Sequence, residues 1–275
     1  PDGLCRALRL HRQNFRSDAQ LKSELAWKLA LKQGGLAVPE PLASHDGNLL
    51  KTIDGVQVDV LTWLQGRPMG QTGEPLAAWV TQDHFYALGK ALANLHKVSD
   101  AWTPPAGFER LSWDQAGLLG DDPTWGRFWQ NPALSARQSS QLLNFRETAL
   151  ETLAKAETLD FGLIHADGVR ENVMIDGDSI QLIDFDDGGW GYRLFEIATV
   201  LRPNEIEPLY EALKKALIAG YSSVRAIDLT LLPLFEAIRA VTYLGWIAPR
   251  MTEPGAQGRL ERFLRGASNK MGLLL

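Results

Sequence analysis

The chain has 275 residues, 45% of them hydrophobic, which is enough to bury a substantial core. Its formal net charge is −5 and it contains no long run of Lys or Arg, which argues against a surface for nucleic acid or anionic membranes. The single cysteine excludes an internal disulfide framework, and without a signal-like start or an apolar run of about 20 residues a cytoplasmic protein with no membrane segment is predicted.

The first predicted element is a strand over residues 4–10, which follows turn-forming residues. A helix is predicted over residues 18–33, because its leucines recur along one helical stripe and Ser17 or Asp18 can cap it. Turns then separate three further strands, predicted over residues 42–44, 49–53 and 56–63.

The strand pattern ends where Gly66 and Pro68 break it, and we interpret residues 65–70 as a hinge. Residues 1–64 are then a small lobe rich in strands, and residues 71–275 a larger lobe rich in helices. Helices of the larger lobe are predicted over residues 81–97, 136–156, 208–221 and 229–250.

Two aromatic features of the larger lobe are open to more than one interpretation. The segment 101–132 contains four tryptophans and many turn residues, so it is either a packed insertion or a wall of a substrate site. In the helix predicted at 229–250, polar and aromatic residues share one face, which is unusual for a buried helix and typical of a pocket wall. The residues of this face are Arg239, Tyr243, Trp246 and Arg250.

The chemistry of the chain is concentrated between residues 163 and 196, where short strands alternate with polar loops. His165, Asp167 and Asn172 have the spacing H-x-D-x-x-x-x-N, and Asp184 follows after a predicted hairpin. The hairpin turn IDGDS by itself needs no function. Two acids and an amide together, however, suit phosphoryl transfer, in which one acid orients a hydroxyl while the others hold magnesium on nucleotide phosphates. Five histidines without zinc-ligand spacing argue against a transition-metal enzyme.

This stretch resembles the aminoglycoside phosphotransferase and choline kinase-like superfamily, and the similarity covers nearly the whole chain. The segments HADGVRENVMIDG and LIDFDDGGWGYRLFEIA, with RLHR and SELAW upstream, are most similar to the bacterial branch of type II homoserine kinases and stress-response Ser/Thr kinases. The resemblance implies an α+β, protein-kinase-like fold of two lobes. It also implies that two strands and a phosphate-covering loop precede residue 1, so we expect the small lobe to be incomplete at its start.

The resemblance implies roles for the central residues. Asp167 is the catalytic aspartate and His165 braces its loop. Asn172 and Asp184 bind Mg²⁺, with Asp186 as a further candidate ligand. Two departures from the family pattern concern the packing around these groups: Gly168 and Val169 follow the catalytic aspartate, and Glu196 occupies a position at which the family usually has Asp.

By the same resemblance, Arg9 contacts the α and β phosphates of ATP, and Glu24 holds it in an ion pair. The alternatives are that Arg9 is an exposed strand cation, and that Glu24 forms only a surface pair with Lys28, worth about 0.3 to 0.5 kcal/mol. In kinase-like folds the backbone before the hinge binds adenine. The expected adenine site is therefore residues 61–64, with Leu61, Trp63 and Leu64 as the named residues.

The acceptor site is expected along the polar and aromatic helix face and the tryptophan-rich segment, open toward Asp167. Two arginines on that face suit a carboxylate, which favours an amino-acid-like acceptor such as homoserine. A cationic acceptor group would instead suit tryptophan faces and nearby acids. The substrate residues predicted on this basis are Trp113, Arg239, Tyr243, Trp246 and Arg250, and the nearby acids are Asp114, Asp121 and Asp122.

The preferred hypothesis is an ATP- and Mg²⁺-dependent kinase that phosphorylates a hydroxyl of a small molecule. Two alternatives are a Ser/Thr protein kinase of the stress-response type and a nucleotide-binding protein with weak or no catalysis. The identity of the acceptor, the choice between ATP and GTP and the oligomeric state are left open by the sequence.

Overall fold

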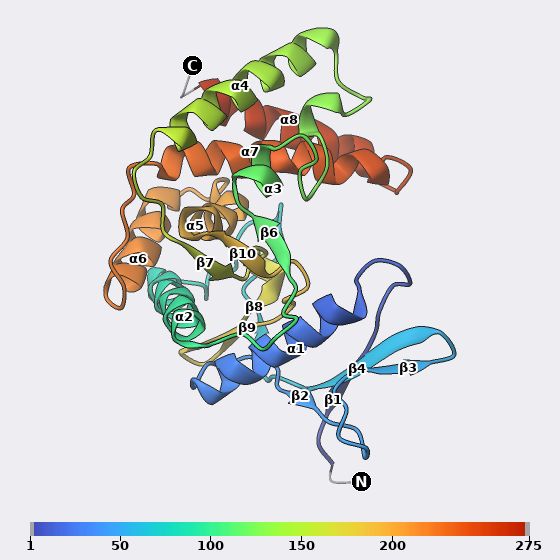
Figure 1. The fold of residues 1–275 in the computed structure, drawn as a ribbon. Coiled ribbons are helices and arrows are strands. Elements are labelled where there is room, and N and C mark those ends of the chain that lie inside the picture. The colour runs from blue at the N-terminus through green and yellow to red at the C-terminus, as the bar shows by residue number, and fades with distance from the viewer. Residues whose placement is uncertain (1–2, 273–275) are drawn as a thin grey trace. The chain divides into compact units, whose positions relative to one another are not determined.

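A computed structural model describes residues 3–272, which contain both helices and strands in an α+β arrangement (Figure 1). The helices are α1 (Asp18–Gln33), α2 (Gln82–Ala101), α3 (Gln115–Leu119), α4 (Ala136–Ala154), α5 (Arg193–Leu201), α6 (Tyr210–Ser222), α7 (Leu232–Ile247) and α8 (Ala256–Gly272). The strands are β1 (Arg6–Leu10), β2 (Pro41–Leu42), β3 (Lys51–Ile53), β4 (Val56–Thr62), β5 (Arg67–Pro68), β6 (Leu111–Trp113), β7 (Phe161–Ile164), β8 (Val173–Asp176), β9 (Ser179–Leu182) and β10 (Gly189–Tyr192). Among residues 3–272, no helix is both long enough and apolar enough to span a membrane.

The chain divides into two compact units. The first unit comprises Pro1–Arg110, Gly162–Gly188 and Pro203–Ile227, and the second comprises Leu111–Phe161, Gly189–Arg202 and Asp228–Leu275. This division follows compactness and not the functional lobes of a kinase. The lobe and hinge boundaries expected from the sequence therefore stay a prediction.

The four-stranded sheet of the first unit is antiparallel and is organised around β4, which pairs with β1, β2 and β3. Its strands are slightly shorter than predicted: β1 begins at Arg6, and β4 ends at Thr62, one residue earlier than expected. In the register of β1 and β4, Arg9 lies directly opposite Asp59. The sheet therefore places these two charges side by side.

Helix α1 begins and ends where the sequence predicts. Ser17 is its N-cap, and the Ser17 hydroxyl accepts a hydrogen bond from the backbone amide of Gln20. The side-chain oxygen of Gln20 in turn accepts a hydrogen bond from the backbone amide of Ser17. Figure 1 shows α1 alongside the sheet. Leu21 and Leu25 form a buried cluster with Leu61 of β4, so the apolar stripe of the helix packs on the sheet.

Helices α2 and α6 pack closely in the first unit because glycines allow their backbones to approach. A Cβ on Gly220 would lie 1.9 Å from the carbonyl oxygen of Tyr86, and one on Gly89 would lie 2.0 Å from that of Leu217. Tyr221 then reaches His96, with 2.7 Å between the hydroxyl and the ring nitrogen Nδ1. A side chain at either glycine would force the helices apart.

The predicted hinge adjoins the hairpin of β8 and β9. Strand β5 pairs antiparallel with β8, and the Met69 amide donates to the carbonyl of Val173 at 2.7 Å. Gly66 adopts a left-handed φ of 104°, and a Cβ there would lie 2.4 Å from the carbonyl oxygen of Ile175. Glycine is thus required for the close approach of the hinge to the hairpin.

The second unit is mainly helical, with α7 packed against α5 and α8, and with β6 and β10 paired in parallel. The helix predicted at 229–250 is observed as α7, followed by a 3₁₀ helix over Ala248–Arg250.

Three helices were not predicted, namely α3, α5 and α8. All nine residues of α5 are buried and its N-cap, Tyr192, makes no side-chain cap bond, so the exposed face and the capping side chain that usually mark a helix are absent. In α8, by contrast, the apolar spacing of Leu260, Phe263, Ala267 and Met271 is a signal that could have been used.

Candidate active site

His165 follows β7 and links the predicted catalytic loop to the segment that carries Asp184. Its Nε2 lies 2.8 Å from the carbonyl oxygen of Ile183, and the Asp167 amide donates to its Nδ1 at 3.3 Å. Complete burial lowers the pKa of His165 to about 4, so the ring is neutral, with the proton on Nε2 facing the carbonyl. Ala166, between His165 and Asp167, adopts a left-handed φ of 62°. His165 thus fixes a strained turn in the loop, as a bracing residue would.

Asn172 contacts Asp167 directly. Its amide nitrogen Nδ2 donates to the Asp167 backbone carbonyl at 2.9 Å and to the carboxylate oxygen Oδ2 at 2.8 Å. Asn172 closes the 3₁₀ helix Arg170–Asn172, which sets the distance between the two side chains. Because the NH₂ group is used in these bonds, the amide oxygen is the atom that Asn172 can offer to a cation.

Asp184 has an exposed carboxylate whose surroundings suit a metal ligand. It is exposed and adopts a left-handed φ of 60°, and the preceding Ile183 amide donates to the carbonyl of Asn172 at 3.0 Å. Between residues 3 and 272, its carboxylate accepts no hydrogen bond and forms no ion pair. An unpaired carboxylate on a strained residue, next to an available amide oxygen, fits a Mg²⁺ site.

The protein ligands alone would leave such a cation incompletely bound. Over the described residues, no three His, Cys, Asp or Glu side chains are grouped so as to hold a metal. Mg²⁺ typically binds through one or two carboxylates together with substrate phosphates. The residues present therefore fit a metal that binds together with a nucleotide.

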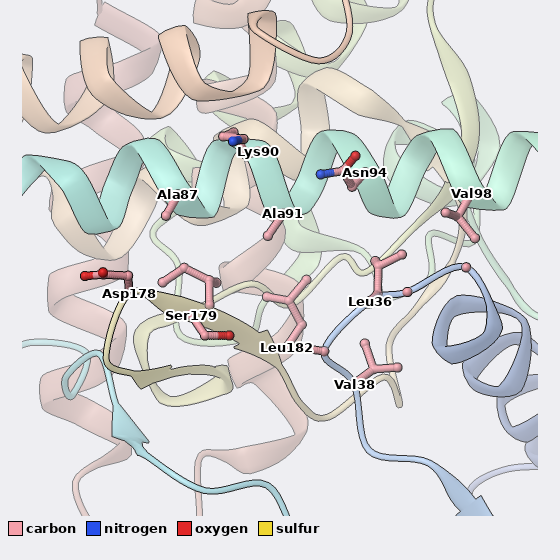
Figure 2. Close-up of a pocket in the computed structure, with 14 residues that line it drawn as sticks. Leu36, Val38, Ala87, Lys90, Ala91, Asn94, Val98, Asp178, Ser179 and Leu182 are labelled. Atoms are coloured by element: carbon pink, nitrogen blue, oxygen red, sulfur yellow. The ribbon is translucent and has the colours of Figure 1, made fainter.

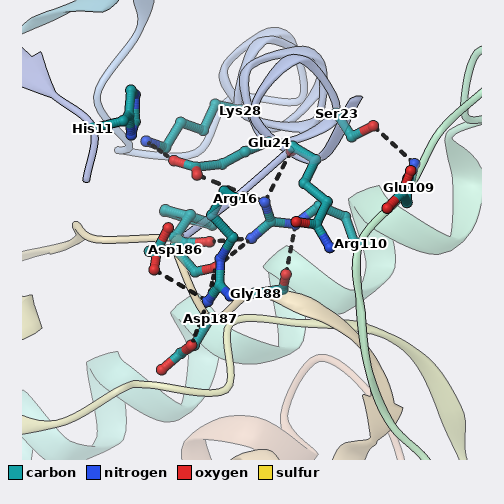
Figure 3. Close-up of polar contacts among 12 residues, drawn as sticks. His11, Arg16, Ser23, Glu24, Lys28, Glu109, Arg110, Asp186, Asp187 and Gly188 are labelled. Atoms are coloured by element: carbon teal, nitrogen blue, oxygen red, sulfur yellow. Dashed lines mark hydrogen bonds and ion pairs between the residues drawn. The ribbon is translucent and has the colours of Figure 1, made fainter. Parts of the chain in front are cut away.

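Asp186, the further candidate ligand, forms an ion pair instead. Arg16 Nη2 lies 3.2 Å from a carboxylate oxygen of Asp186 and 2.9 Å from one of Asp187 (Figure 3). Arg16 thus neutralises two of the three acids that follow Ile183 and leaves Asp184 unpaired. Metal binding by Asp186 stays a prediction.

Arg9 and Glu24 form the ion pair expected from the resemblance, at 2.7 Å between Nη1 and Oε1. Arg9 is also bound through Nε and Nη2 to both carboxylate oxygens of Asp59, at 2.8 and 2.7 Å, and His11 lies 2.6 Å from the same acid. Three of the five guanidinium N–H groups of Arg9 are therefore used by carboxylates. Its side chain is 22% exposed, which leaves the remaining donors access to a ligand.

The alternative that Glu24 forms only a surface pair with Lys28 is wrong. Both side chains are fully buried, with Lys28 Nζ 2.7 Å from Glu24 Oε1 and 5.5 Å from the ring centroid of Phe185. Burial alone would raise the pKa of Glu24, but Lys28, Arg9 and Arg110 outweigh it and hold that pKa far below its usual range. Burial lowers the pKa of Lys28 despite the neighbouring carboxylate. Glu24 is thus an anion shared by several cations in the protein interior.

The expected adenine residues differ in their environments. Leu61 lies in β4, where its side chain is part of the core beneath α1. Trp63 and Leu64 follow the end of the strand, and Trp63 is 57% exposed. Within the described part of the chain, the backbone groups of Trp63 and Leu64 make no hydrogen bond. These two residues therefore have backbone donors and acceptors to offer, whereas the backbone of Leu61 is bonded in the sheet.

The predicted acceptor residues meet in the second unit around Trp125. The Trp125 ring lies 5.3 Å from that of Trp113, 5.6 Å from that of Tyr243 and 4.4 Å from the guanidinium carbon of Arg239. Arg250 stacks on Trp246 at 4.2 Å and donates to its carbonyl at 2.7 Å. The helix face and the aromatic segment are thus in contact, as expected, although Arg239 and Trp113 are fully buried. Their role in acceptor binding stays a prediction.

The acids named for a cationic acceptor group are also in the second unit. Asp114 and Asp121 line a hollow of about 440 Å³ together with Arg146 and Tyr192. Asp114 caps α3 through one carboxylate oxygen, and Asp121 pairs with Arg146 at 2.8 Å. Glu196, which stands where the family usually has Asp, also lies in this unit and is completely buried in α5.

A hollow of about 460 Å³ in the first unit lies between α2, residues 34–38 and β9. Figure 2 shows Ala91 and Asn94 of α2 facing Leu36 and Leu182 across it. None of the predicted site residues lines this hollow. It is therefore separate from the groups that we assign to phosphoryl transfer.

Two buried groups of this site were not predicted. Arg110 donates to the carbonyl oxygens of Phe185, Asp186 and Gly188, all beside Asp184. No pattern in the sequence around Arg110 indicates this. Asp59 carried a signal, because an acid inside an apolar strand is uncommon and needs a partner.

Comparisons with known proteins agree with this geometry. The sequence profile of the Phosphotransferase enzyme family matches residues 3–227. Homoserine kinase of Sinorhizobium medicae is 29% identical over 246 residues, which cover 82% of this chain and 68% of that protein. Homoserine kinase of Neisseria meningitidis is 28% identical over 215 residues, which cover 74% of this chain and 62% of that protein.

Solved structures are similar over almost the whole chain. A microcompartment-associated aminopropanol kinase is 28% identical, with a TM-score of 0.81 over 97% of this chain and 84% of its own. Amicoumacin kinase, solved with AMP-PNP, Ca²⁺ and its antibiotic, is 20% identical, with a TM-score of 0.79 over 98% of this chain and 83% of its own. The protein-kinase-like fold and the superfamily expected from the motif are thereby confirmed, and the matched relatives give no support for the protein kinase alternative.

Proposed function

The chain belongs to the Phosphotransferase enzyme family, and we propose that it transfers the γ-phosphoryl group of ATP, with Mg²⁺, to the hydroxyl of a small amine-bearing molecule. The observation that carries the proposal is the contact of Asn172 with Asp167 on one side and with the segment leading into Asp184 on the other. One short region thus joins an acid for the hydroxyl to two ligands for a cation.

In this proposal Asp167 orients the acceptor hydroxyl and takes its proton as the phosphoryl group moves. A loose transition state requires positioning and charge neutralisation more than a strong base, so an ordinary carboxylate is sufficient. The bond from Asn172 Nδ2 to Oδ2 fixes the orientation of the Asp167 carboxylate. His165 acts through the loop and does not touch the reactants.

Mg²⁺, when bound, neutralises the phosphate oxygens, and Asp184 and the amide oxygen of Asn172 would hold it. Arg9 would contact the nucleotide phosphates with the N–H groups that its two carboxylate partners leave unused. The unpaired backbone at Trp63 and Leu64 would bind adenine. Glu24 and Asp59 would hold the Arg9 guanidinium in place before the nucleotide binds.

The acceptor class follows from the relatives and from the charges of the second unit. Homoserine and aminopropanol, the acceptors in the names of two relatives, each carry an amine and a hydroxyl. Asp114 and Asp121, which line one hollow, and the tryptophan faces are groups that attract an ammonium. An acceptor carboxylate, as in homoserine, would instead pair with Arg250 or Arg239, which contact aromatic rings through the faces of their guanidinium groups.

The test is a screen of ATP consumption against homoserine, 1-amino-2-propanol, choline, an aminoglycoside and a generic protein acceptor. Formation of the phosphate ester is verified by mass spectrometry, and the Asp167→Asn variant is the control. We expect a phosphorylated product from at least one of the primary amines. Phosphorylation of the protein alone, or of none of these compounds, would contradict the proposal.

A further inference from the structure

The side chain of Arg110 joins α1 to residues 184–188, which we call the Asp184 loop. Its Nε donates to the carbonyl of Gly188 at 2.6 Å, and its Nη2 donates to those of Phe185 and Asp186, both at 2.7 Å. On the opposite side, Nη1 donates to the carbonyl of Gln20 in α1 at 3.0 Å. Figure 3 shows this guanidinium among α1, Asp186 and Gly188.

The hydrogen bonds of Arg110 require one backbone conformation of the Asp184 loop. Arg110 is only 8% exposed, and a buried guanidinium is tolerated only where acceptors replace its water. Those acceptors are backbone carbonyls, and Glu24, whose Oε2 lies 3.7 Å away, adds an ion pair. Any rotation of the loop backbone would turn carbonyls away from the charge. The loop conformation and the position of α1 are therefore stabilised by the same side chain.

The neighbouring glycine allows the loop to pack equally closely on α1. A Cβ on Gly188 would lie 2.7 Å from the ring of Trp27, which belongs to α1. The loop is thus held to the helix at its last residue by packing and along its backbone by Arg110. Its first residue is Asp184, whose left-handed φ of 60° would relax in a free chain.

We propose that Arg110 is a positioning residue that holds the Asp184 loop, and thereby the Asp184 carboxylate, in the metal-binding geometry, and that it couples this loop to Glu24. The proposal rests on the proposed function of the site. Arg16 completes the arrangement, because it neutralises Asp186 and Asp187 and leaves only Asp184 for a cation. Arg110 thus acts on the loop backbone, and Arg16 on its carboxylates.

Coupling to Glu24 gives the proposal its specific consequence. Glu24 holds Arg9, which would contact the nucleotide, and lies against Arg110, which holds the metal loop. Disturbing Arg110 should therefore weaken the contribution of Mg²⁺ to ATP binding more than it weakens ATP binding itself. A purely structural residue would weaken both equally.

The test compares Arg110→Lys with Arg225→Lys, a control in the same unit whose side chain pairs with Asp100 at the surface. Lysine keeps the charge, but its single nitrogen cannot serve acceptors on two sides as the guanidinium does. We expect Arg110→Lys to lower the Mg²⁺-dependent part of ATP affinity and kcat by about 10- to 100-fold, as loss of a supporting group around a metal does. ATP affinity without metal and KM for the acceptor should change by less than about threefold, and the control should match the wild type.

Two further measurements do not depend on catalysis. Hydrogen exchange of the backbone amides in residues 184–188, without nucleotide, should be faster in Arg110→Lys than in the wild type. Millimolar guanidinium should restore metal-dependent ATP binding to Arg110→Ala but not to Asp184→Asn. Equal losses of ATP affinity with and without Mg²⁺, unchanged exchange, or a wild-type metal dependence in Arg110→Lys would overturn the proposal. A wild-type protein that binds Mg·ATP normally but phosphorylates no acceptor would instead overturn the proposed function alone.

Discussion

Replacing Glu24 by Gln should destabilise the protein far more than an ordinary charge substitution on a helix. The change removes the anion shared by Arg9, Lys28 and Arg110 and leaves Lys28, which is fully buried, without its partner. Breaking a buried ion pair from one side typically costs about 3 to 5 kcal/mol, because an uncompensated charge stays in the interior. At roughly 2 to 4 °C per kcal/mol for a chain of this size, Tm should fall by about 6 to 20 °C.

The same helix supplies a matched control and a rescue. Lys22 pairs with Asp18 at 3.8 Å on the exposed side of α1, so Lys22→Gln should cost about 0.5 kcal/mol or less. Adding Lys28→Met to Glu24→Gln removes the stranded cation and should recover part of the lost stability. Urea denaturation of the four proteins gives the free energies of unfolding. A double variant no more stable than Glu24→Gln alone, or a Lys22→Gln variant equally destabilised, would refute the reasoning.

Three further predictions concern the catalytic loop and the metal. Asp167→Asn should abolish phosphoryl transfer while leaving ATP affinity within a few-fold of the wild type, and turnover close to that of the wild type would remove Asp167 from its role. Asp184→Asn should lose the thermal stabilisation that Mg²⁺ adds to that of ATP, since an anionic ligand of a hard cation is lost, whereas a retained shift would contradict our assignment. Because burial lowers the pKa of His165 from 6.5 to about 4, the unfolded chain binds this proton more readily. The contribution of neutral His165 to the free energy of unfolding is therefore complete above pH 6.5 and is lost as the pH falls toward 4. The urea concentration at the unfolding midpoint should therefore depend less on pH in His165→Gln than in the wild type across this range. An equal pH dependence in the two proteins would count against a neutral His165.

The parts of the site that lie close together in the chain were predictable from the sequence alone. His165, Asp167 and Asn172 fall within one short loop, and a tight hairpin returns the chain to Asp184, so local geometry alone brings them together. Helix α1 was predicted to its exact ends because its N-cap candidates and apolar stripe are local signals. Arg9 and Glu24 were paired only through the family resemblance, since no local pattern connects a strand cation with a helix anion.

The environment of these groups was decided by the tertiary structure. Arg110 donates to Gly188 and Gln20, which are 78 and 90 residues away, and Asp59 meets Arg9 across 50 residues. The pair of Glu24 and Lys28 has the spacing of an exposed helical pair, and only the packing around α1 turns it into a buried one. All nine residues of helix α5 are buried, including Arg193, Glu196 and Thr199, so it lacks the exposed polar face of a surface helix. Periodicity and capping in a sequence indicate which face of a segment is exposed and where the segment begins and ends. The partners of a buried charge depend instead on which distant segments the fold places beside it.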